Sequence, residues 1–318
     1  MKKLDELEII KIFQNSFGSK SKFVPEDVET VQLGNTTIVT KSDMLVESTD
    51  VPLGMKINEI SRKSLVSCVS DFASKGVKPE YAIISLSIPR KFSIAKIKKL
   101  AIGFRQATNE FGVKIVGGDV NEGKELVINV SLIGKAKKIV PRHGAKAGDI
   151  IITSGPFGHT LAGLHVILNK ASAPKAAKKL FKKKVFRPTT RLRFGLAIRK
   201  YLSSSMDSSD GLSSTIHDIS KQSKKKFIIT KLPTDSAVVE FSRKNRISLL
   251  DLVFNGGEEY EIVATVPPKN ILEVRRLAKI NKIRLFEIGY VTKGIGVILL
   301  QKTKTMNIEN KGWLHFQS

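Results

Sequence analysis

The chain has 318 residues, of which 41% are hydrophobic and 26% charged, a composition typical of about two globular domains rather than a disordered chain. Lys and Arg number 54 against 29 Asp and Glu, and this excess of +25 attracts polyanions such as nucleic acid, anionic membranes or phosphorylated small molecules. The single cysteine, Cys68, excludes intramolecular disulfides and cysteine-based zinc clusters. The N-terminus does not read as a signal peptide, and residues 150–169, the longest uncharged stretch, are interrupted by glycine, proline and histidine. We therefore expect a cytoplasmic protein without a transmembrane helix.

The N-terminal half alternates between β-rich and amphipathic segments. Apolar residues recur at helical spacing from Leu4 to Phe13 and predict a short helix. The next predicted elements, in chain order, are a strand at 36–42, a helix at 58–73, a strand at 81–88, a helix at 93–110 and strands at 113–119 and 125–136. This order predicts a first α+β domain over residues 1–138.

Pro141, Gly144 and Gly148 mark the predicted boundary to a second domain over residues 139–318. Its predicted elements are a strand at 149–154, helices through Tyr201, a strand into Met206, a helix beginning at Asp210 and further alternating elements to Leu300. The stretch from 170 to 200 carries twelve positive charges and no acid. Such a run is more often a solvated helix face than a binding site, and aromatic residues for stacking nucleic-acid bases are sparse here. Specific nucleic-acid binding is not expected.

Several acidic residues stand where an ordinary surface acid would not. Asp43, Asp119 and Asp207 each end a predicted strand beside glycine or serine. Asp71 is the only charge between Ser64 and Ser74, so we expect it to be partly buried on its helix. Taken singly, each aspartate is more often a helix cap or a turn residue. Together they favour a magnesium site, and magnesium in proteins commonly serves phosphate chemistry.

The usual phosphate-binding motifs are absent from the sequence. It contains no GxxxxGK[ST], no GxGxxG that opens a helix and no protein-kinase catalytic loop. Instead, paired glycines precede Asp119 and Glu258, where backbone can approach a ligand closely beside a carboxylate. The segment SSDGL at 208–212 precedes a predicted helix whose N–H groups can face an anion.

Five ordered blocks resemble the thiamine-monophosphate kinase family of the aminoimidazole ribonucleotide synthetase-like superfamily. They are SDMLVESTD at 42–50, LVSCVSDFASKGVKPEYAIISLSIP at 65–89, GGDV at 117–120, MDSSDGLSSTIHDI at 206–219 and GGEEYEI at 256–262, and KGWLHF at 311–316 resembles the family's C-terminal signature. The resemblance implies an α+β fold of two α/β-type domains, with an N-terminal mixed sheet used for dimerisation. It also implies ATP-dependent phosphorylation of thiamine monophosphate to thiamine diphosphate, by direct in-line transfer assisted by several Mg²⁺ ions.

The resemblance also implies roles for individual residues, none of them a catalytic group beyond metal and phosphate positioning. The implied metal ligands are Asp27, Ser42, Asp43, Asp71, Asp119, Asp207 and Asp210. The positions implied to bind ATP are Gly118, Asp119, Arg142 and Ser209, and those implied to contact the thiamine substrate are Asp50, Glu258 and Trp313. The indole of Trp313 offers a face for the cationic thiazolium, and a buried C-terminal anchor is its alternative role.

Four positions depart from the family's pattern. Only Asp27 aligns comfortably in the N-terminal acidic block, beside Glu26; Lys41 replaces a small hydroxyl residue, Asp50 a histidine and Glu259 an aspartate. The ammonium of Lys41 beside Asp43 could replace or exclude one metal ion. Two alternative functions remain open at this point: another ATP-dependent member of the superfamily, resembling the ribonucleotide synthetase, and a non-catalytic protein that binds polyanions or nucleic acid.

Overall fold

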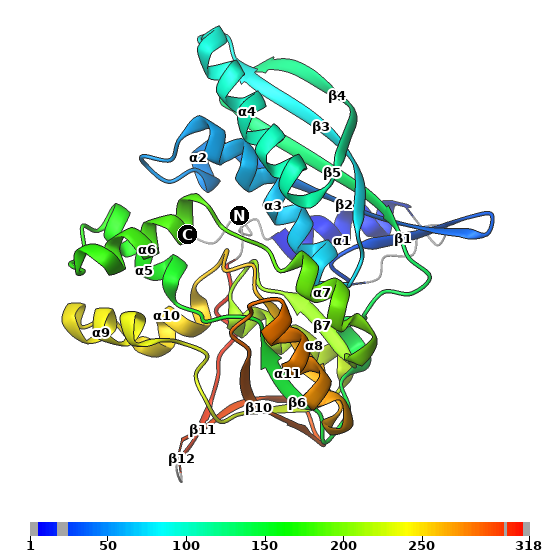
Figure 1. The fold of residues 1–318 in the computed structure, drawn as a ribbon, viewed down its shortest axis with the longest axis vertical. Coiled ribbons are helices and arrows are strands. Elements are labelled where there is room, and N and C mark those ends of the chain that lie inside the picture. Colours follow the sequence, from blue (N-terminus) through cyan, green and yellow to red (C-terminus); the bar gives the residue numbers. More distant parts are fainter. Residues whose placement is uncertain (1–5, 18–24, 302–303, 314–318) are drawn as a thin grey trace.

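A computed structural model of the chain describes residues 6–17, 25–301 and 304–313, arranged around two β-sheets (Figure 1). The first sheet has five strands in the order β1-β2-β5-β3-β4, and only its β3–β4 pair is parallel. Its strands are β1 (Glu29–Leu33), β2 (Thr36–Val46), β3 (Pro79–Pro89), β4 (Lys114–Gly123) and β5 (Val127–Lys135). The helices of this half are α1 (Glu6–Phe17), α2 (Glu47–Asp50), α3 (Ile57–Ser74) and α4 (Ile94–Phe111).

Helices α3 and α4 pack against each other, and α3 also lies on the inner face of the first sheet (Figure 1). The Ser93 hydroxyl accepts the N–H of Lys96 and so caps the start of α4, which ends at Gly112 with a left-handed φ of 68°. Apolar residues of α3, among them Leu65, Val69 and Phe72, are fully buried. Burial of these side chains is the main stabilising contribution that holds α3 in place.

The second sheet has seven strands in the order β12-β11-β8-β10-β6-β9-β7 and is also mixed, with β8 and β11 parallel. Its strands are β6 (Ile150–Thr153), β7 (Ser204–Asp207), β8 (Lys226–Ile229), β9 (Ile262–Val266), β10 (Phe286–Thr292), β11 (Gly296–Gln301) and β12 (Lys304–Asn307). The helices of this half are α5 (His159–Leu168), α6 (Lys175–Phe186), α7 (Leu192–Ile198), α8 (Leu212–Ser223), α9 (Ser236–Asn245), α10 (Leu249–Asn255) and α11 (Ile271–Ile280). Short 3₁₀ turns cover Arg142–Gly144, Arg199–Tyr201 and Pro268–Asn270.

One apolar core spans both halves of the chain. It joins α3 and the first sheet to α7, α11 and β9, so that Phe72 and Val130 belong to the same buried cluster as Phe194 and Val266. The boundary predicted after residue 138 lies in the segment between β5 and β6. Helix α3 contacts elements of both halves, including β2, β5, β7 and α7. This helix therefore lies between the two sheets and packs against strands of both.

The α+β fold expected from the sequence is confirmed, and so are most of its elements. Helices α3 and α4 lie within one residue of their predicted bounds, and the N-terminal helix covers Glu6–Phe17, with Leu4 outside the described residues. Strand β1 has no counterpart among the predicted elements. The predicted ends of two strands were wrong, because their ladders continue: β2 runs past Asp43 to Val46, and β4 runs past Asp119 to Gly123. Helix α8 begins at Leu212 rather than Asp210, because Gly211 has a φ of 108°.

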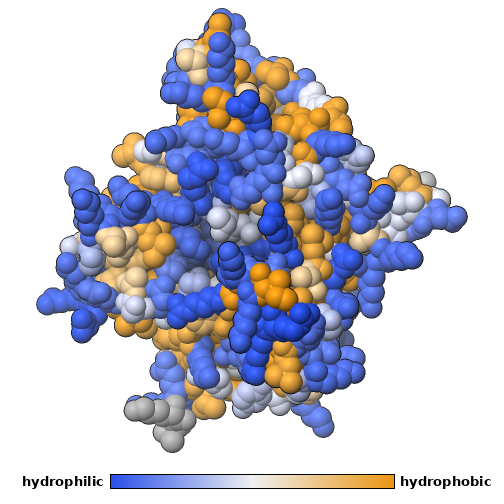
Figure 2. Space-filling view, in the orientation of Figure 1, coloured by the Kyte–Doolittle hydropathy of each residue, from blue (hydrophilic) through white to orange (hydrophobic). Residues whose placement is uncertain are grey.

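Hydrophilic residues dominate the face shown in Figure 2, with apolar patches over the part where α4 and β3 lie. The basic stretch includes α6, which buries Phe181 and Val185 while Lys179 and Lys183 on the opposite side are exposed. This is the solvated helix face that the sequence analysis favoured. Among the described residues, no helix is long and apolar enough to cross a membrane.

Candidate active site

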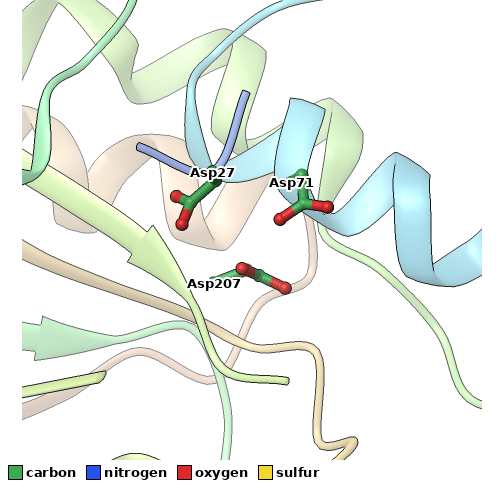
Figure 3. Close-up of side chains that lie close together, drawn as sticks. All are labelled: Asp27, Asp71 and Asp207. Carbon is green, nitrogen blue, oxygen red and sulfur yellow. The ribbon is translucent and has the colours of Figure 1, made fainter. Parts of the chain in front are cut away.

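Three buried aspartates from different parts of the fold meet between the two sheets. Asp27 precedes β1, Asp71 lies in the last turns of α3 and Asp207 ends β7. One carboxylate oxygen from each lies within 4.8 Å of the others. Figure 3 shows the three carboxylates facing a common space. The sequence predicted all three as metal ligands, and the structure brings these three together.

The charge of this cluster is only partly compensated by protein groups. Burial, together with the neighbouring Asp207 and Asp43, holds the pKa of the Asp71 carboxyl well above its usual range despite the nearby Lys41. Burial and the charge of Asp27 raise the pKa of Asp207 to about 7. Such shifts mark sites where added positive charge is favourable. Three converging carboxylates are also the hard oxygen donors that Mg²⁺ prefers, so the residues present fit this ion.

Asp27 differs from its two neighbours because cations already surround it. Lys75 Nζ lies 2.9 Å from Asp27 Oδ2, Arg142 Nε donates to Oδ1 at 2.8 Å, and the Ser74 hydroxyl donates to Oδ2 at 2.9 Å. Burial alone would raise the pKa of Asp27, but Lys75 and Arg142 outweigh it and lower the pKa. Lys75 also contacts Glu26 at 2.6 Å and donates to the carbonyl of Ser205 at 2.8 Å. This completely buried ammonium therefore joins the N-terminal acidic block to β7.

Lys41 brings another ammonium group to the cluster. Its Nζ lies 3.4 Å from Asp43 Oδ1 and 3.5 Å from Asp71 Oδ2. Burial alone would lower the pKa of Lys41, but Asp71 and Asp43 outweigh it and raise the pKa, so the side chain stays charged. Asp43, a predicted metal ligand, is thus linked to the aspartate trio through an ammonium.

One face of α3 connects this cluster to a second polar region. Lys63, Ser67, Asp71 and Lys75 follow one another at intervals of four residues, so they line one side of the helix. At the N-terminal end of this face, Lys63 Nζ contacts Glu258 at 2.5 Å and donates to the carbonyl of Asp50 at 2.8 Å. The predicted substrate positions Asp50 and Glu258 therefore meet at Lys63.

The loop before α8 brings three more of the predicted residues together with Glu258. The Ser209 carbonyl accepts the N–H of Glu258 at 2.5 Å, and the Asp210 carbonyl accepts the N–H of Trp313 at 3.0 Å. Burial, with a further contribution from Glu6, raises the pKa of Asp210 to about 6. Trp313 has 60% of its surface exposed, so it is not the buried C-terminal anchor that was its alternative role. Residues 314–316 of the C-terminal block lie outside the described residues.

Three predicted residues lie on or near the outer face of the first sheet, away from the trio. Ser42 contacts the Ser131 hydroxyl at 2.9 Å, while its neighbour Asp43 points to the inner face. Asp119 lies on the exposed edge strand β4, opposite Ser85 of the neighbouring strand β3. Ser85 lies in turn opposite Asn129 of β5, which belongs to this outer face. A Cβ on Gly118 would come within 1.9 Å of the Ile84 carbonyl oxygen, so close strand packing already requires glycine there.

Two of the residues that differ from the family's usual pattern, Asp50 and Glu259, have clear local roles. The Asp50 carboxylate accepts the N–H of Val46 at 2.7 Å and fixes the turn into α2. Glu259 accepts the N–H groups of Gly158 and Thr160 at 2.8 and 3.0 Å and so caps the start of α5. The longer carboxylate that replaces the usual aspartate thus braces the loop before α5.

Sequence reasoning missed the cations that position these acids. Lys63 and Lys75 were not singled out, although their spacing from Asp71 on a largely apolar helix was a usable signal. It also missed a buried pair in the second half, where Arg191 Nε contacts Glu261 at 2.6 Å and the Ser154 hydroxyl donates to Glu261 at 2.7 Å. Glu261 lies within the GGEEYEI block, but the sequence does not disclose its partner 70 residues away.

Comparison with known proteins gives consistent matches over the whole chain. Residues 25–136 match the family model of the AIR synthase related protein N-terminal domain. The chain is 49% identical over 317 residues to a thiamine-monophosphate kinase from Nitrosopumilus maritimus, covering 100% of both chains. It is 31% identical to a thiamine-monophosphate kinase from Pyrococcus horikoshii, covering 100% of this chain and 98% of the relative.

Solved structures agree with these relatives. A structure described as AaThiL complexed with AMPPCP and TMP superposes with a TM-score of 0.86 at 27% identity, covering 99% of this chain and 98% of that one. The thiamine monophosphate kinase from Aquifex aeolicus superposes with a TM-score of 0.82 at 26% identity, covering 95% and 98% of the two chains.

Proposed function

Because the chain belongs to the thiamine-monophosphate kinase family, we propose that it transfers the terminal phosphoryl group of ATP to thiamine monophosphate. The observation that carries this proposal is the 49% identity over the full length of both chains. In this reaction an oxygen of the acceptor phosphate bonds to the γ-phosphorus of ATP, while the bond from that phosphorus to the bridging oxygen of ADP breaks. The products are thiamine diphosphate and ADP.

The acceptor explains why the site needs no strong general base. A phosphate monoester has a second pKa of about 6, so its attacking oxygen is already largely ionised near neutral pH. The main barrier is the approach of two polyanions, and catalysis of such a step is mostly positioning and charge neutralisation. A site that gathers cations and metal-ligating carboxylates supports this chemistry.

We propose Asp27, Asp71 and Asp207 as the central magnesium ligands. With Mg²⁺ held by these three carboxylates, the site would supply positive charge that neutralises the negative charge developing on the phosphate oxygens during transfer. Asp71 and Asp207 supply carboxylates whose raised pKa values indicate uncompensated negative charge. Asp43 and Asp210 remain proposed outer members of this set, on β2 and before α8.

Arg142 and Ser209 remain our proposed contacts to ATP. Arg142 is held by Asp27 and lies 3.5 Å from Asp218, so its guanidinium is oriented beside the carboxylate trio. Burial alone would lower the pKa of Arg142, but Asp27 outweighs it and raises the pKa, so its positive charge is available to a phosphate. Ser209 lies in the loop that leads to helix α8.

For the thiamine substrate we propose the region around Asp50, Glu258 and Trp313. Glu258 and Asp50 meet at Lys63, and Trp313 is tied to Asp210 by its backbone. The exposed indole offers a π-face to the cationic thiazolium. Negative charge at Glu258 would favour the same cation.

We also propose that the chain forms a homodimer through its first sheet. Met44 and Ile83 lie on the outer face of this sheet and expose 63% and 40% of their surfaces, and Val116 on the edge strand β4 exposes 59%. An exposed apolar sheet face beside an exposed edge strand favours association with a second copy. Gly118, Asp119 and Ser42 lie on or beside this face. In a dimer these residues of one chain would therefore lie at the interface, where they could contact ATP bound by the partner chain. A cytoplasmic location remains part of the proposal and fits the single buried thiol of Cys68.

The deciding experiment is magnesium-dependent ADP release from ATP with thiamine monophosphate as acceptor. We expect the native chain to form thiamine diphosphate and Asp71→Asn to lose at least about 100-fold of this activity, because even changes to groups that only hydrogen-bond to metal ligands commonly cost 10–100-fold. Asp235→Asn is the matched control, since Asp235 caps helix α9 outside the proposed site and asparagine also caps helices. If ATP were consumed only with an aminoimidazole-pathway acceptor, the proposal would be wrong, and the alternative function that resembles the ribonucleotide synthetase would be favoured.

A further inference from the structure

Lys41 occupies an unusual position on strand β2. The inner face of this strand alternates Val39, Lys41, Asp43 and Leu45, and the two apolar members are buried in the core. A lysine and an aspartate between them lie on the side of the sheet that faces α3. Charges in such a place are costly unless they are paired.

The ammonium of Lys41 bridges two carboxylates at ion-pair distance without a close hydrogen bond to either. Its Nζ lies 3.4 Å from Asp43 and 3.5 Å from Asp71, longer than ordinary N–H···O hydrogen bonds. Lys75 provides the contrast, because its Nζ makes close contacts of 2.6 and 2.8 Å with Glu26 and the Ser205 carbonyl. The Lys41 ammonium therefore lies between two carboxylates that come from separate elements, β2 and α3.

From this geometry we propose that the Lys41 ammonium takes the place of one divalent cation between Asp43 and Asp71. The inference rests on the proposed magnesium site, and it states that this chain holds one metal ion fewer than its carboxylates would otherwise accept. An ammonium supplies one positive charge permanently, whereas a divalent ion supplies two charges and dissociates. Neutralisation at this position is then independent of the free magnesium concentration.

The direct test counts bound metal in the full-length chain. Mn²⁺ replaces Mg²⁺ as the probe, and free Mn²⁺ is measured by electron paramagnetic resonance during titration. We expect Lys41→Met to bind one more Mn²⁺ per chain than the native protein, and Lys41→Arg to bind the native number. The double variant Lys41→Met with Asp43→Asn should return to the native number, because the new site loses one of its two carboxylates. Lys231→Met, a change at an exposed lysine outside the cluster, is the control.

The outcomes separate this inference from the proposed function. If the native chain binds no Mn²⁺, the proposed metal site itself is wrong. If the native chain binds Mn²⁺ and folded Lys41→Met binds the same number, the Lys41 inference is wrong while the site stands. Lys41→Gln removes the charge and keeps a polar end on a side chain one atom shorter than lysine, and it provides the same count should the methionine variant not fold. Activity gives a second readout: ADP release by Lys41→Met should require a higher magnesium concentration for half-maximal rate.

Discussion

Lys63 and Glu258 form an ion pair of 2.5 Å that joins helix α3 to the loop before β9. The Lys63 side chain is only 3% exposed, and its ammonium also donates to the Asp50 carbonyl. Glu258 has a φ of 61°, a left-handed conformation that is uncommon for a residue other than glycine. Lys63 thus fixes the positions of Asp50 and Glu258, the two proposed substrate contacts, and stabilises the uncommon backbone conformation of Glu258.

Replacing this ammonium should weaken use of the thiamine substrate. We expect Lys63→Met to raise the KM for thiamine monophosphate about 10-fold, equivalent to about 1.4 kcal/mol, because Glu258 would no longer be held in place. The KM for ATP and the number of bound Mn²⁺ ions should stay near their native values. Steady-state kinetics with each substrate varied in turn measures this. An increase confined to the KM for ATP would place Lys63 in the nucleotide site instead.

Removing the Asp207 carboxylate should stabilise the metal-free protein at alkaline pH. Its folded pKa of about 7 lies above the ordinary aspartate value of about 4, so ionisation of this group lowers stability as the pH rises from about 4 to about 7. We expect Asp207→Asn to melt at a higher temperature than the native chain at pH 8 in EDTA. It should also lose most of the increase that magnesium gives the native protein. Asp235→Asn is again the control and should melt no higher than the native chain, and a lower melting temperature for Asp207→Asn in EDTA would contradict the assignment.

The Asp235 carboxylate should stabilise the fold at neutral pH and lose this contribution in acid, the opposite of Asp207. A hydrogen bond from His159 at 2.9 Å, which outweighs burial, lowers the pKa of Asp235 to about 2. A depressed carboxyl pKa stabilises the fold above the unfolded value near 4, and this contribution is lost as the pH falls from about 4 to about 2. Because the Asp235 side chain is still 19% exposed, solvent partly screens this interaction, and we expect an effect of at most about 1 kcal/mol. Urea unfolding at pH 7 and pH 3 should show a smaller pH difference for Asp235→Asn than for the native chain.

Charge on the outer face of the first sheet should dissociate the proposed dimer. We expect Met44→Lys combined with Ile83→Lys to reduce the mass measured by light scattering from that of two chains to that of one. Buried like charges facing each other across an interface are strongly unfavourable. Leu272→Lys is the control, because Leu272 is 72% exposed on α11, away from the first sheet. A native protein that already has the mass of one chain would refute the dimer.

Local patterns predicted much of this fold and part of the site. The apolar periodicity of 58–73 located α3, and the isolation of Asp71 in that helix predicted its burial. The position of Asp207 at a strand end was also correct. By contrast, alternation along β2 places Ser42 and Asp43 on opposite faces of the sheet, but only the packing of α3 decides which of the two faces the aspartate trio. Partners of Lys63 and Asp27 lie 195 and 115 residues away along the chain, beyond any local pattern.

The continuous core around α3 restricts how substrates can enter. Domains that close on their ligands by rotating about a hinge usually meet through small, polar interfaces that slide or separate easily. Here such a rotation would pull Phe72 and Phe194 out of shared apolar packing, together with the buried Lys75 that spans both halves. We therefore expect the two sheets to stay fixed relative to each other through the catalytic cycle. Substrates would then enter the site through movement of its surrounding loops, such as the segment before α8 that contacts Trp313.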